Sequence, residues 1–84
     1  MLNSAQIRSA RGCLNISQLE LAKETGIHLN TIHRIEGDDA LLARASMATV
    51  KKIKEFFEHK GIKFLSPPEK DGSGAGLRYF PPDE

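Results

Sequence analysis

His28, His33 and the single cysteine, Cys13, have side chains of types that can support catalysis or metal binding. The two histidines are five positions apart, whereas those of a His-Glu-x-x-His zinc site are four apart on one helix face. A single cysteine excludes an intrachain disulfide and a multi-cysteine zinc site. No positioned base accompanies Cys13 in the sequence, and its apolar neighbours predict a buried small hydrophobic residue rather than a reactive thiol. We therefore expect no enzyme, no bound metal and no cofactor.

Two short helices are predicted in the middle of the chain. Ser17-Gln18-Leu19-Glu20 is a capping box, in which each of the two outer side chains satisfies a free amide at a helix start. Gly26 ends this helix, because glycine turns the chain sharply at low steric cost. A second helix follows over residues 29–36, with Ile32 and Ile35 facing inward, and the next glycine closes it. Two short helices joined by a tight, glycine-containing turn form a helix-turn-helix.

Two further helices are predicted on either side of this pair. Asn3 and Gln6 have the spacing of another capping box, so a first helix is expected to end near Cys13. Residues 37–45 are expected to form a loop. Ser46 is the expected N-cap of the last helix, and Gly61 fits the position after its end. The apolar stripe of that helix comprises Met47, Val50, Ile53 and Phe57, with Phe56 beside it.

A β-hairpin is predicted after the last helix. Ile62–Leu65 and Leu77–Phe80 are short β-prone runs that flank a stretch, residues 66–76, with two prolines and three glycines. Gly72-Ser73-Gly74-Ala75-Gly76 is followed by no lysine and no helix, so it is a flexible connector and not a phosphate loop. Two strands alone are marginal in water, so they must pack on the helices or pair with a second chain. The chain therefore divides into a helical domain, residues 1–61, and a hairpin and tail, residues 62–84, that is a candidate dimerisation element.

Composition and charge describe one small domain. The 84 residues carry a formal net charge of +1, with 39% hydrophobic and 27% charged residues. Between Arg44 and Lys63, six lysines and arginines stand against two glutamates, a local excess that attracts phosphates but that solvation of a helix explains equally well. No run approaches the ~18 apolar residues of a membrane span, and no signal peptide opens the chain. We expect a cytoplasmic protein without a membrane partner.

The central helices resemble the Xre family of helix-turn-helix regulators, which includes the lambda-type phage repressors and Cro. The resemblance is carried by Ser17-Gln18-Leu19-Glu20-Leu21-Ala22, by Gly26-Ile27 and by Thr31-Ile32-His33-Arg34-Ile35-Glu36-Gly37. It covers about residues 3–57, with Ser46–Val50 also in register. It implies a mainly α, four-helix, lambda-repressor-like DNA-binding domain, here followed by the short C-terminal hairpin.

The resemblance also implies a division of labour on DNA. The first helix of the pair would lie across the sugar-phosphate backbone, and the second would enter the major groove. Asn30 and Arg34 are the expected base-reading residues, because Asn pairs bidentately with adenine and Arg with guanine. Arg11 and Glu36 match a pair that forms a structural salt bridge in relatives. The expected DNA-binding residues are Gln18, His28, Leu29, Asn30, Thr31, His33, Arg34 and Arg44, and for each polar one the alternative is a solvated surface residue.

Several positions depart from the family's pattern. His28 stands where the helix cap is usually Ser or Thr, and Leu29 stands where a polar or basic residue is common. Leu19 replaces a polar residue, and Leu41 and Leu42 lie in the predicted loop. A leucine at position 29 can contact a thymine methyl group, whereas grouped exposed leucines indicate a surface that binds protein.

Two functions therefore compete. The first is a sequence-specific transcriptional regulator, a repressor that binds an inverted-repeat operator in double-stranded DNA as a homodimer. The alternative is a helix-turn-helix fold that binds a protein partner, as an antitoxin or an antiactivator does. The low net charge, the leucines and the acidic pair Asp38-Asp39 favour the alternative. Salt-dependent retention on DNA separates the two.

Overall fold

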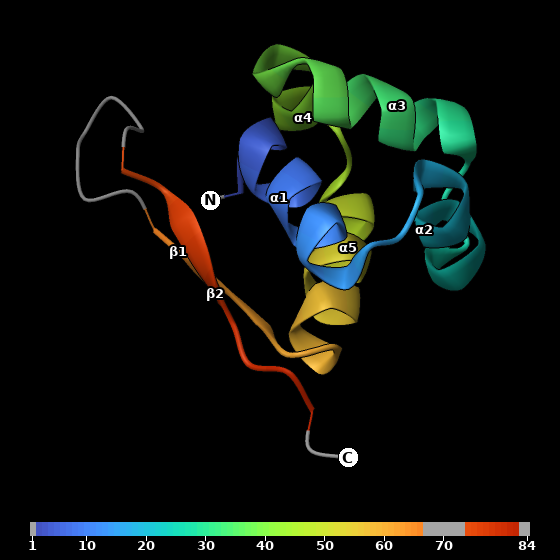
Figure 1. Ribbon diagram of the computed structural model, residues 1–84. Helices are drawn as coiled ribbons and strands as arrows, with labels where there is room; N and C mark the ends of the chain where they lie inside the picture. The colour runs from blue at the N-terminus through green and yellow to red at the C-terminus, as the bar shows by residue number, and fades with distance from the viewer. Residues whose placement is uncertain (1, 67–73, 83–84) are drawn as a thin grey trace.

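The computed structural model describes residues 2–66 and 74–82, which form a mainly helical molecule with a short C-terminal hairpin (Figure 1). The helices α1 and α5 lie at the centre of Figure 1, with α2 on one side, α3 and α4 above, and the hairpin on the other side. The elements are α1 (Ser4–Leu14), α2 (Gln18–Thr25), α3 (Leu29–Gly37), α4 (Asp39–Arg44), α5 (Met47–His59), β1 (Ile62–Leu65) and β2 (Gly76–Tyr79).

The predicted starts of three helices are confirmed. At α1, Asn3 Oδ1 accepts from the Gln6 amide at 2.8 Å, and Gln6 Oε1 accepts from the Asn3 amide at 2.9 Å. At α2, Ser17 Oγ accepts from the Glu20 amide at 3.0 Å, and the glutamate side chain returns to the serine amide. Ser46 Oγ caps α5 by accepting from the amide three residues further on. Each cap satisfies amides that have no partner inside the helix.

The helix α4 lies where the sequence predicted a loop, so the prediction of four helices is wrong: the described residues contain five. Asp38 caps the extra helix, since its Oδ1 accepts from the Ala40 amide at 2.8 Å. The five residues after Asp39, Ala-Leu-Leu-Ala-Arg, are strong helix formers. Leu42 is only 5% exposed and belongs to the core, and its burial offsets the entropy lost when this short helix becomes ordered. Leu41 remains partly exposed, so the two leucines do not form one surface group.

One hydrophobic core joins the helices to β1. Its members are Leu2, Ile7, Ala10, Leu21, Ala22, Ile27, Ile32, Ile35, Leu42, Ile53, Phe57 and Ile62. Ile32 and Ile35, which were predicted to face inward from the second helix of the pair, are among them. Two predictions of burial are wrong. Met47 is 89% exposed, because the apolar stripe of α5 begins one turn before the part of the helix that packs against the core. Cys13 is exposed, since it lies one turn after the exposed Ser9 on the same side of α1.

The hairpin packs on the helices of its own chain. β1 and β2 are antiparallel, with Phe64 paired to Leu77, and they lie against α5 and α1. Ile62 is 2% exposed, and Phe64 and Leu77 pack against the core. The Phe64 ring meets the Phe57 ring edge to face, with 6.0 Å between the centroids. Of the two arrangements that sequence left open, packing on the helices is therefore present.

Gln6 ties the hairpin to α1. Its side chain is 3% exposed, and Nε2 donates to Leu65 O at 2.9 Å and to Gly76 O at 2.7 Å. These two carbonyls belong to paired residues at one end of the hairpin, one on each strand. Because Oε1 of the same side chain caps α1, a single glutamine orients the helix start and both strands.

The hairpin boundaries differ from prediction by one residue at β2, which runs from Gly76 to Tyr79 rather than to Phe80. Of the predicted connector, Gly72 and Ser73 lie outside the described residues, as do Asp83 and Glu84. Gly76, which was predicted to belong to the connector, is the first residue of β2. Among the helices described, none has the length and apolar character needed to cross a membrane.

Candidate nucleic-acid interface

A three-residue turn, residues 26–28, connects α2 to α3. Gly26 has a φ of 74°, a left-handed conformation that glycine adopts without a Cβ penalty, and its amide donates to Ala22 O at 2.9 Å. Ile27 then enters the core at 8% exposure and anchors the turn. The Ile27 amide donates to Thr25 Oγ1 at 3.3 Å. The position at which α3 begins is therefore set by a glycine, an apolar anchor and one side-chain hydrogen bond.

His28 caps α3. Its Nδ1 accepts from the Asn30 amide at 3.1 Å, and its backbone is extended, with φ −60° and ψ 139°. The imidazole thus takes the place that a serine or threonine hydroxyl would fill, which answers the doubt that the sequence raised about this cap.

The polar face of α3 points to solvent. Ile32 and Ile35 are 0% and 2% exposed and face the core. The side chains expected to meet DNA lie on the opposite side: His28, Leu29, Asn30, His33 and Arg34 are exposed, and Thr31 is partly buried. This distribution follows from the 3.6-residue period of a helix with one apolar stripe. The predicted exposure is confirmed, while contact with DNA stays a prediction.

The expected ion pair between α1 and α3 is present. Arg11 Nε lies 2.8 Å from Glu36 Oε2 and 3.1 Å from Oε1, and Arg11 Nη2 lies 2.9 Å from Oε1. The Glu36 side chain is 2% exposed and that of Arg11 is 22% exposed. Arg8, which sequence reasoning did not single out, donates from Nη1 to the backbone carbonyl of Glu36. Two arginines of α1 therefore hold the C-terminal end of α3.

Gln18 belongs to the same network. Its Nε2 donates to Glu36 Oε1 at 3.3 Å, and the residue is partly buried. This bond was not predicted, because no local pattern links the first residue of α2 to a residue near the end of α3. The remaining hydrogen-bonding groups of the amide are not used by this contact. The expected contact of Gln18 with phosphate or base stays a prediction.

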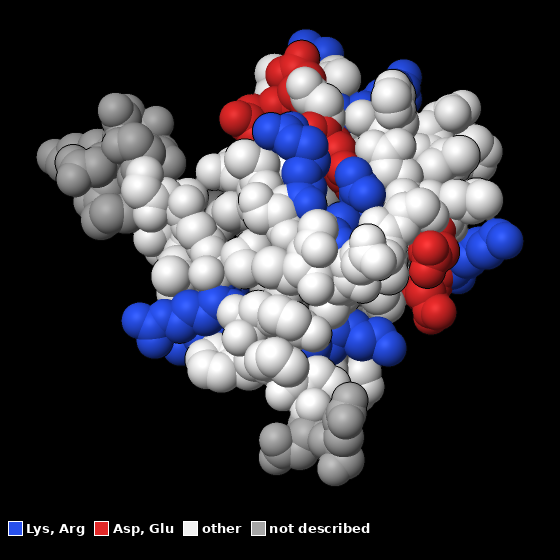
Figure 2. Space-filling view, in the orientation of Figure 1, with Lys and Arg blue, Asp and Glu red and all other residues white. Residues whose placement is uncertain are grey.

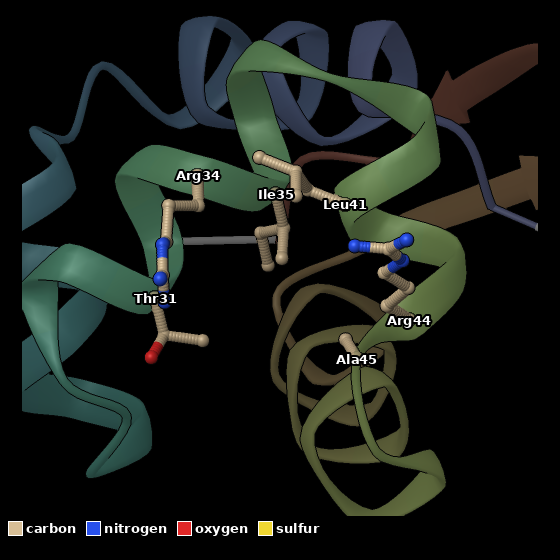
Figure 3. Close-up of a pocket in the computed structure, with 6 residues that line it drawn as sticks. All are labelled: Thr31, Arg34, Ile35, Leu41, Arg44 and Ala45. Carbon is tan, nitrogen blue, oxygen red and sulfur yellow. The ribbon is translucent and has the colours of Figure 1, made fainter.

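A hollow of about 260 Å³ lies between α3 and the end of α4 (Figure 3). Arg34 and Thr31 line one side of it, and Arg44 lines the other. Ile35 and Leu41 lie between them, and Ala45 completes the lining. The structure thus brings together three of the expected DNA-binding residues, Thr31, Arg34 and Arg44, around an apolar floor. The sequence missed the floor because it predicted a loop where Leu41 lies on α4.

Charge is distributed unevenly over the surface. In Figure 2 acidic and basic atoms are mixed over the region where α3 and α4 lie, and basic atoms without acidic neighbours lie along the hairpin. Exposed Asp38 and Asp39 supply acidic groups at the start of α4, although Asp39 Oδ1 accepts from the Ser4 amide at 2.7 Å. On the hairpin, Lys63 and Arg78 are direct cross-strand partners and both are exposed.

Residues 2–66 and 74–82 contain no group of three or more His, Cys, Asp or Glu side chains that could hold a metal ion. In the same residues, every buried side-chain nitrogen and oxygen has a hydrogen-bond partner. Comparisons with family models, with curated proteins and with solved structures found no match to this chain.

Proposed function

We propose that this chain is a sequence-specific DNA-binding regulator in which α2, the turn and α3 act as a helix-turn-helix of the Xre type. The observation that carries the proposal is the outward polar face of α3. Asn30, His33 and Arg34 project from a helix of nine residues whose opposite side is anchored by Ile32 and Ile35. A helix of this kind fits the major groove, where Asn and Arg side chains distinguish base edges.

Arg34 and Arg44 support the proposal from both sides of the hollow. Both side chains are exposed, and their guanidinium groups suit bidentate contact with phosphate or guanine. The apolar floor between them suits the deoxyribose that separates consecutive phosphates. In this arrangement α3 supplies base recognition, and the basic side chains supply affinity that depends on salt.

We further propose that two copies bind an inverted repeat and repress transcription by occluding a promoter in the cytoplasm. A recognition helix of nine residues reads only a short half-site. Two half-sites on one face of the duplex give the specificity that one cannot, and their spacing would mirror the two-fold symmetry of the dimer.

Selection of bound duplexes from a random-sequence pool tests the proposal. We expect enrichment of one motif that contains an inverted repeat, and affinity that falls steeply as salt rises. Light scattering of the protein and of its complex then gives the number of copies per duplex. Enrichment of no motif, together with no retention of DNA at low salt, would contradict DNA recognition.

A pair of variants controls for net charge. Arg44→Ala removes a cation beside the hollow, and Arg78→Ala removes one on the hairpin, which Figure 1 places on the other side of α1 and α5 from α3. We expect Arg44→Ala to reduce the slope of log affinity against log salt by about one, as loss of one phosphate contact does. Arg78→Ala should leave the slope unchanged. Equal effects of the two changes would place the DNA elsewhere.

A second function rests on the exposed apolar side chains. Leu19 is 50% exposed on α2, Leu29 is 38% exposed on α3, and Met47 is 89% exposed at the start of α5. We propose, as the alternative, that the fold binds a protein partner in the manner of an antitoxin or antiactivator. Absence of DNA binding together with capture of one partner, lost in Leu29→Ser, would favour this alternative.

A further inference from the structure

We infer that His28 donates a hydrogen bond from Nε2 to an acceptor on DNA, and that its role as the cap of α3 dictates this polarity. The inference rests on the proposed function and extends it. It assigns to one residue both the start of the recognition helix and the chemical type of group that this residue recognises.

The first step is the protonation of the ring. His28 Nδ1 accepts the hydrogen of the Asn30 amide at 3.1 Å. A ring nitrogen that accepts a hydrogen bond carries no proton, so the neutral imidazole holds its single proton on Nε2. The hydrogen bond at one nitrogen thus selects the tautomer at the other. Without the cap, both tautomers of an exposed histidine would be populated.

The second step is the position of the donor. Nδ1 and Nε2 lie on different edges of the ring, so a ring whose Nδ1 faces the helix turns Nε2–H away from it. His28 is exposed and immediately precedes Leu29, the first residue of α3. The N-terminal residues of a helix that enters the major groove are the ones that approach base edges and the flanking phosphates. The outward group is therefore a donor at the place where the duplex would be nearest.

The third step is the type of partner. A donor with no acceptor on the same edge pairs with a phosphate oxygen, with N7 of a purine, with O6 of guanine or with O4 of thymine. It cannot pair with the exocyclic amino groups of adenine or cytosine, which are donors themselves. His28 would therefore favour an acceptor and reject a donor at its position, while Asn30, which has both kinds of group, would not.

Two substitutions separate capping from donation. Ser caps helices well but has no donor at the reach of Nε2, so His28→Ser keeps the cap and removes the outward hydrogen bond. Asn caps equally well and keeps an outward N–H on its amide, so His28→Asn keeps both functions over a shorter reach. We expect both variants to keep the thermal stability of the wild type. We expect the selected duplex to bind about tenfold more weakly to His28→Ser and at intermediate strength to His28→Asn.

The tautomer is measured without DNA. Long-range proton–nitrogen NMR in mildly alkaline buffer should show that the His28 proton resides on Nε2, whereas His33, which has no such cap to make, serves as an internal comparison. A proton on Nδ1, or equal populations of the two tautomers, would overturn the inference whatever the affinity of the variants.

Modified duplexes identify the acceptor. Methylphosphonate at single phosphates removes a phosphate acceptor, 7-deazapurines remove N7, and base analogues that lack O6 of guanine or O4 of thymine remove the carbonyl acceptors. One of these changes should abolish the difference between wild type and His28→Ser. A difference that survives all of them, or a His28→Ser variant that binds as tightly as wild type, would overturn the inference while leaving DNA binding intact. Failure of the wild type to bind DNA would instead remove the proposed function and this inference together.

Discussion

Gln18 and Glu36 are joined by a hydrogen bond of 3.3 Å from Gln18 Nε2 to Glu36 Oε1. The same carboxylate accepts a hydrogen bond from Arg11 of α1. The Glu36 side chain, near the end of α3, therefore contacts both the start of α2 and the last turn of α1. Because Glu36 is 2% exposed, its charge depends on these donors in place of water. The relative placement of the three N-terminal helices therefore rests on a buried polar network as well as on apolar packing.

Removal of the Glu36 carboxylate should destabilise the packing of the three N-terminal helices. We expect Glu36→Ala to lower the free energy of unfolding by about 3 kcal/mol, because the Arg11 guanidinium and the Gln18 amide lose their buried partner. The midpoint of thermal unfolding should fall by more than 10 °C, since about 1 kcal/mol corresponds to roughly 4–8 °C in a domain of this size. Circular dichroism measures the change. The exposed Glu24 of α2 offers a matched control, and a Glu24→Ala variant as unstable as Glu36→Ala would contradict this account.

Arg34→Ala should affect recognition and leave folding unchanged. The side chain is exposed beside the hollow and makes no ion pair among the described residues, so thermal stability should be within error of the wild type. We expect affinity for the selected duplex to fall by about 1–3 kcal/mol, while affinity for scrambled DNA falls much less. Fluorescence anisotropy with both duplexes measures the two losses. Arg34→Lys keeps the charge and loses the bidentate geometry, so it should fail to restore the preference for the selected duplex over scrambled DNA. If wild type and variant alike do not distinguish the duplexes, Arg34 reads no base.

Gly61→Ala should destabilise the junction between α5 and the hairpin. Gly61 has a φ of 97°, and an added Cβ would collide with the backbone carbonyl of Phe80. The same residue is held against Gly61 by the bond from the Phe80 amide to Gly61 O. We expect a loss of at least about 2 kcal/mol in the free energy of unfolding. Gly12 is the matched control: it lies within α1, and an added Cβ meets nothing within 4 Å. Gly12→Ala should therefore stabilise the protein by about 0.5–1 kcal/mol. Similar effects of the two substitutions in urea denaturation would contradict the structure here.

Gln6→Leu should loosen the hairpin. The change leaves the carbonyls of Leu65 and Gly76 without their buried donor and removes the acceptor at the start of α1, so we expect a loss of about 2 kcal/mol. Hydrogen exchange of amides in β1 and β2 should become faster than that of amides in α5. Gln6→Glu separates the two roles, because it keeps the acceptor for the Asn3 amide but places a charge against the strand carbonyls. Unchanged exchange in the strands of both variants would show that this side chain does not hold the hairpin.

The elements were predictable where their signals are local. Asn3, Ser17 and Ser46 each cap a helix through an amide within three residues, and the inward positions of α3 follow from the helical period. The exposed face that begins at His28 was predicted for the same reason, since burying Ile32 and Ile35 turns the remaining side chains outward. Residues 39–44 were missed because an Asp cap and five helix formers make a marginal helix, whose formation depends on the burial of Leu42.

What only the tertiary structure decided are the contacts between residues far apart in the chain. The two bonds of Gln6 to the hairpin span 59 and 70 positions, and the bond of Gln18 to Glu36 spans 18. The hollow likewise exists only because α4 folds back on α3 and sets Arg44 opposite Arg34. Caps and helical faces depend on neighbours within one turn, and the sequence by itself therefore determined them. Partners across the core depend on how the helices pack, a property that no single segment contains.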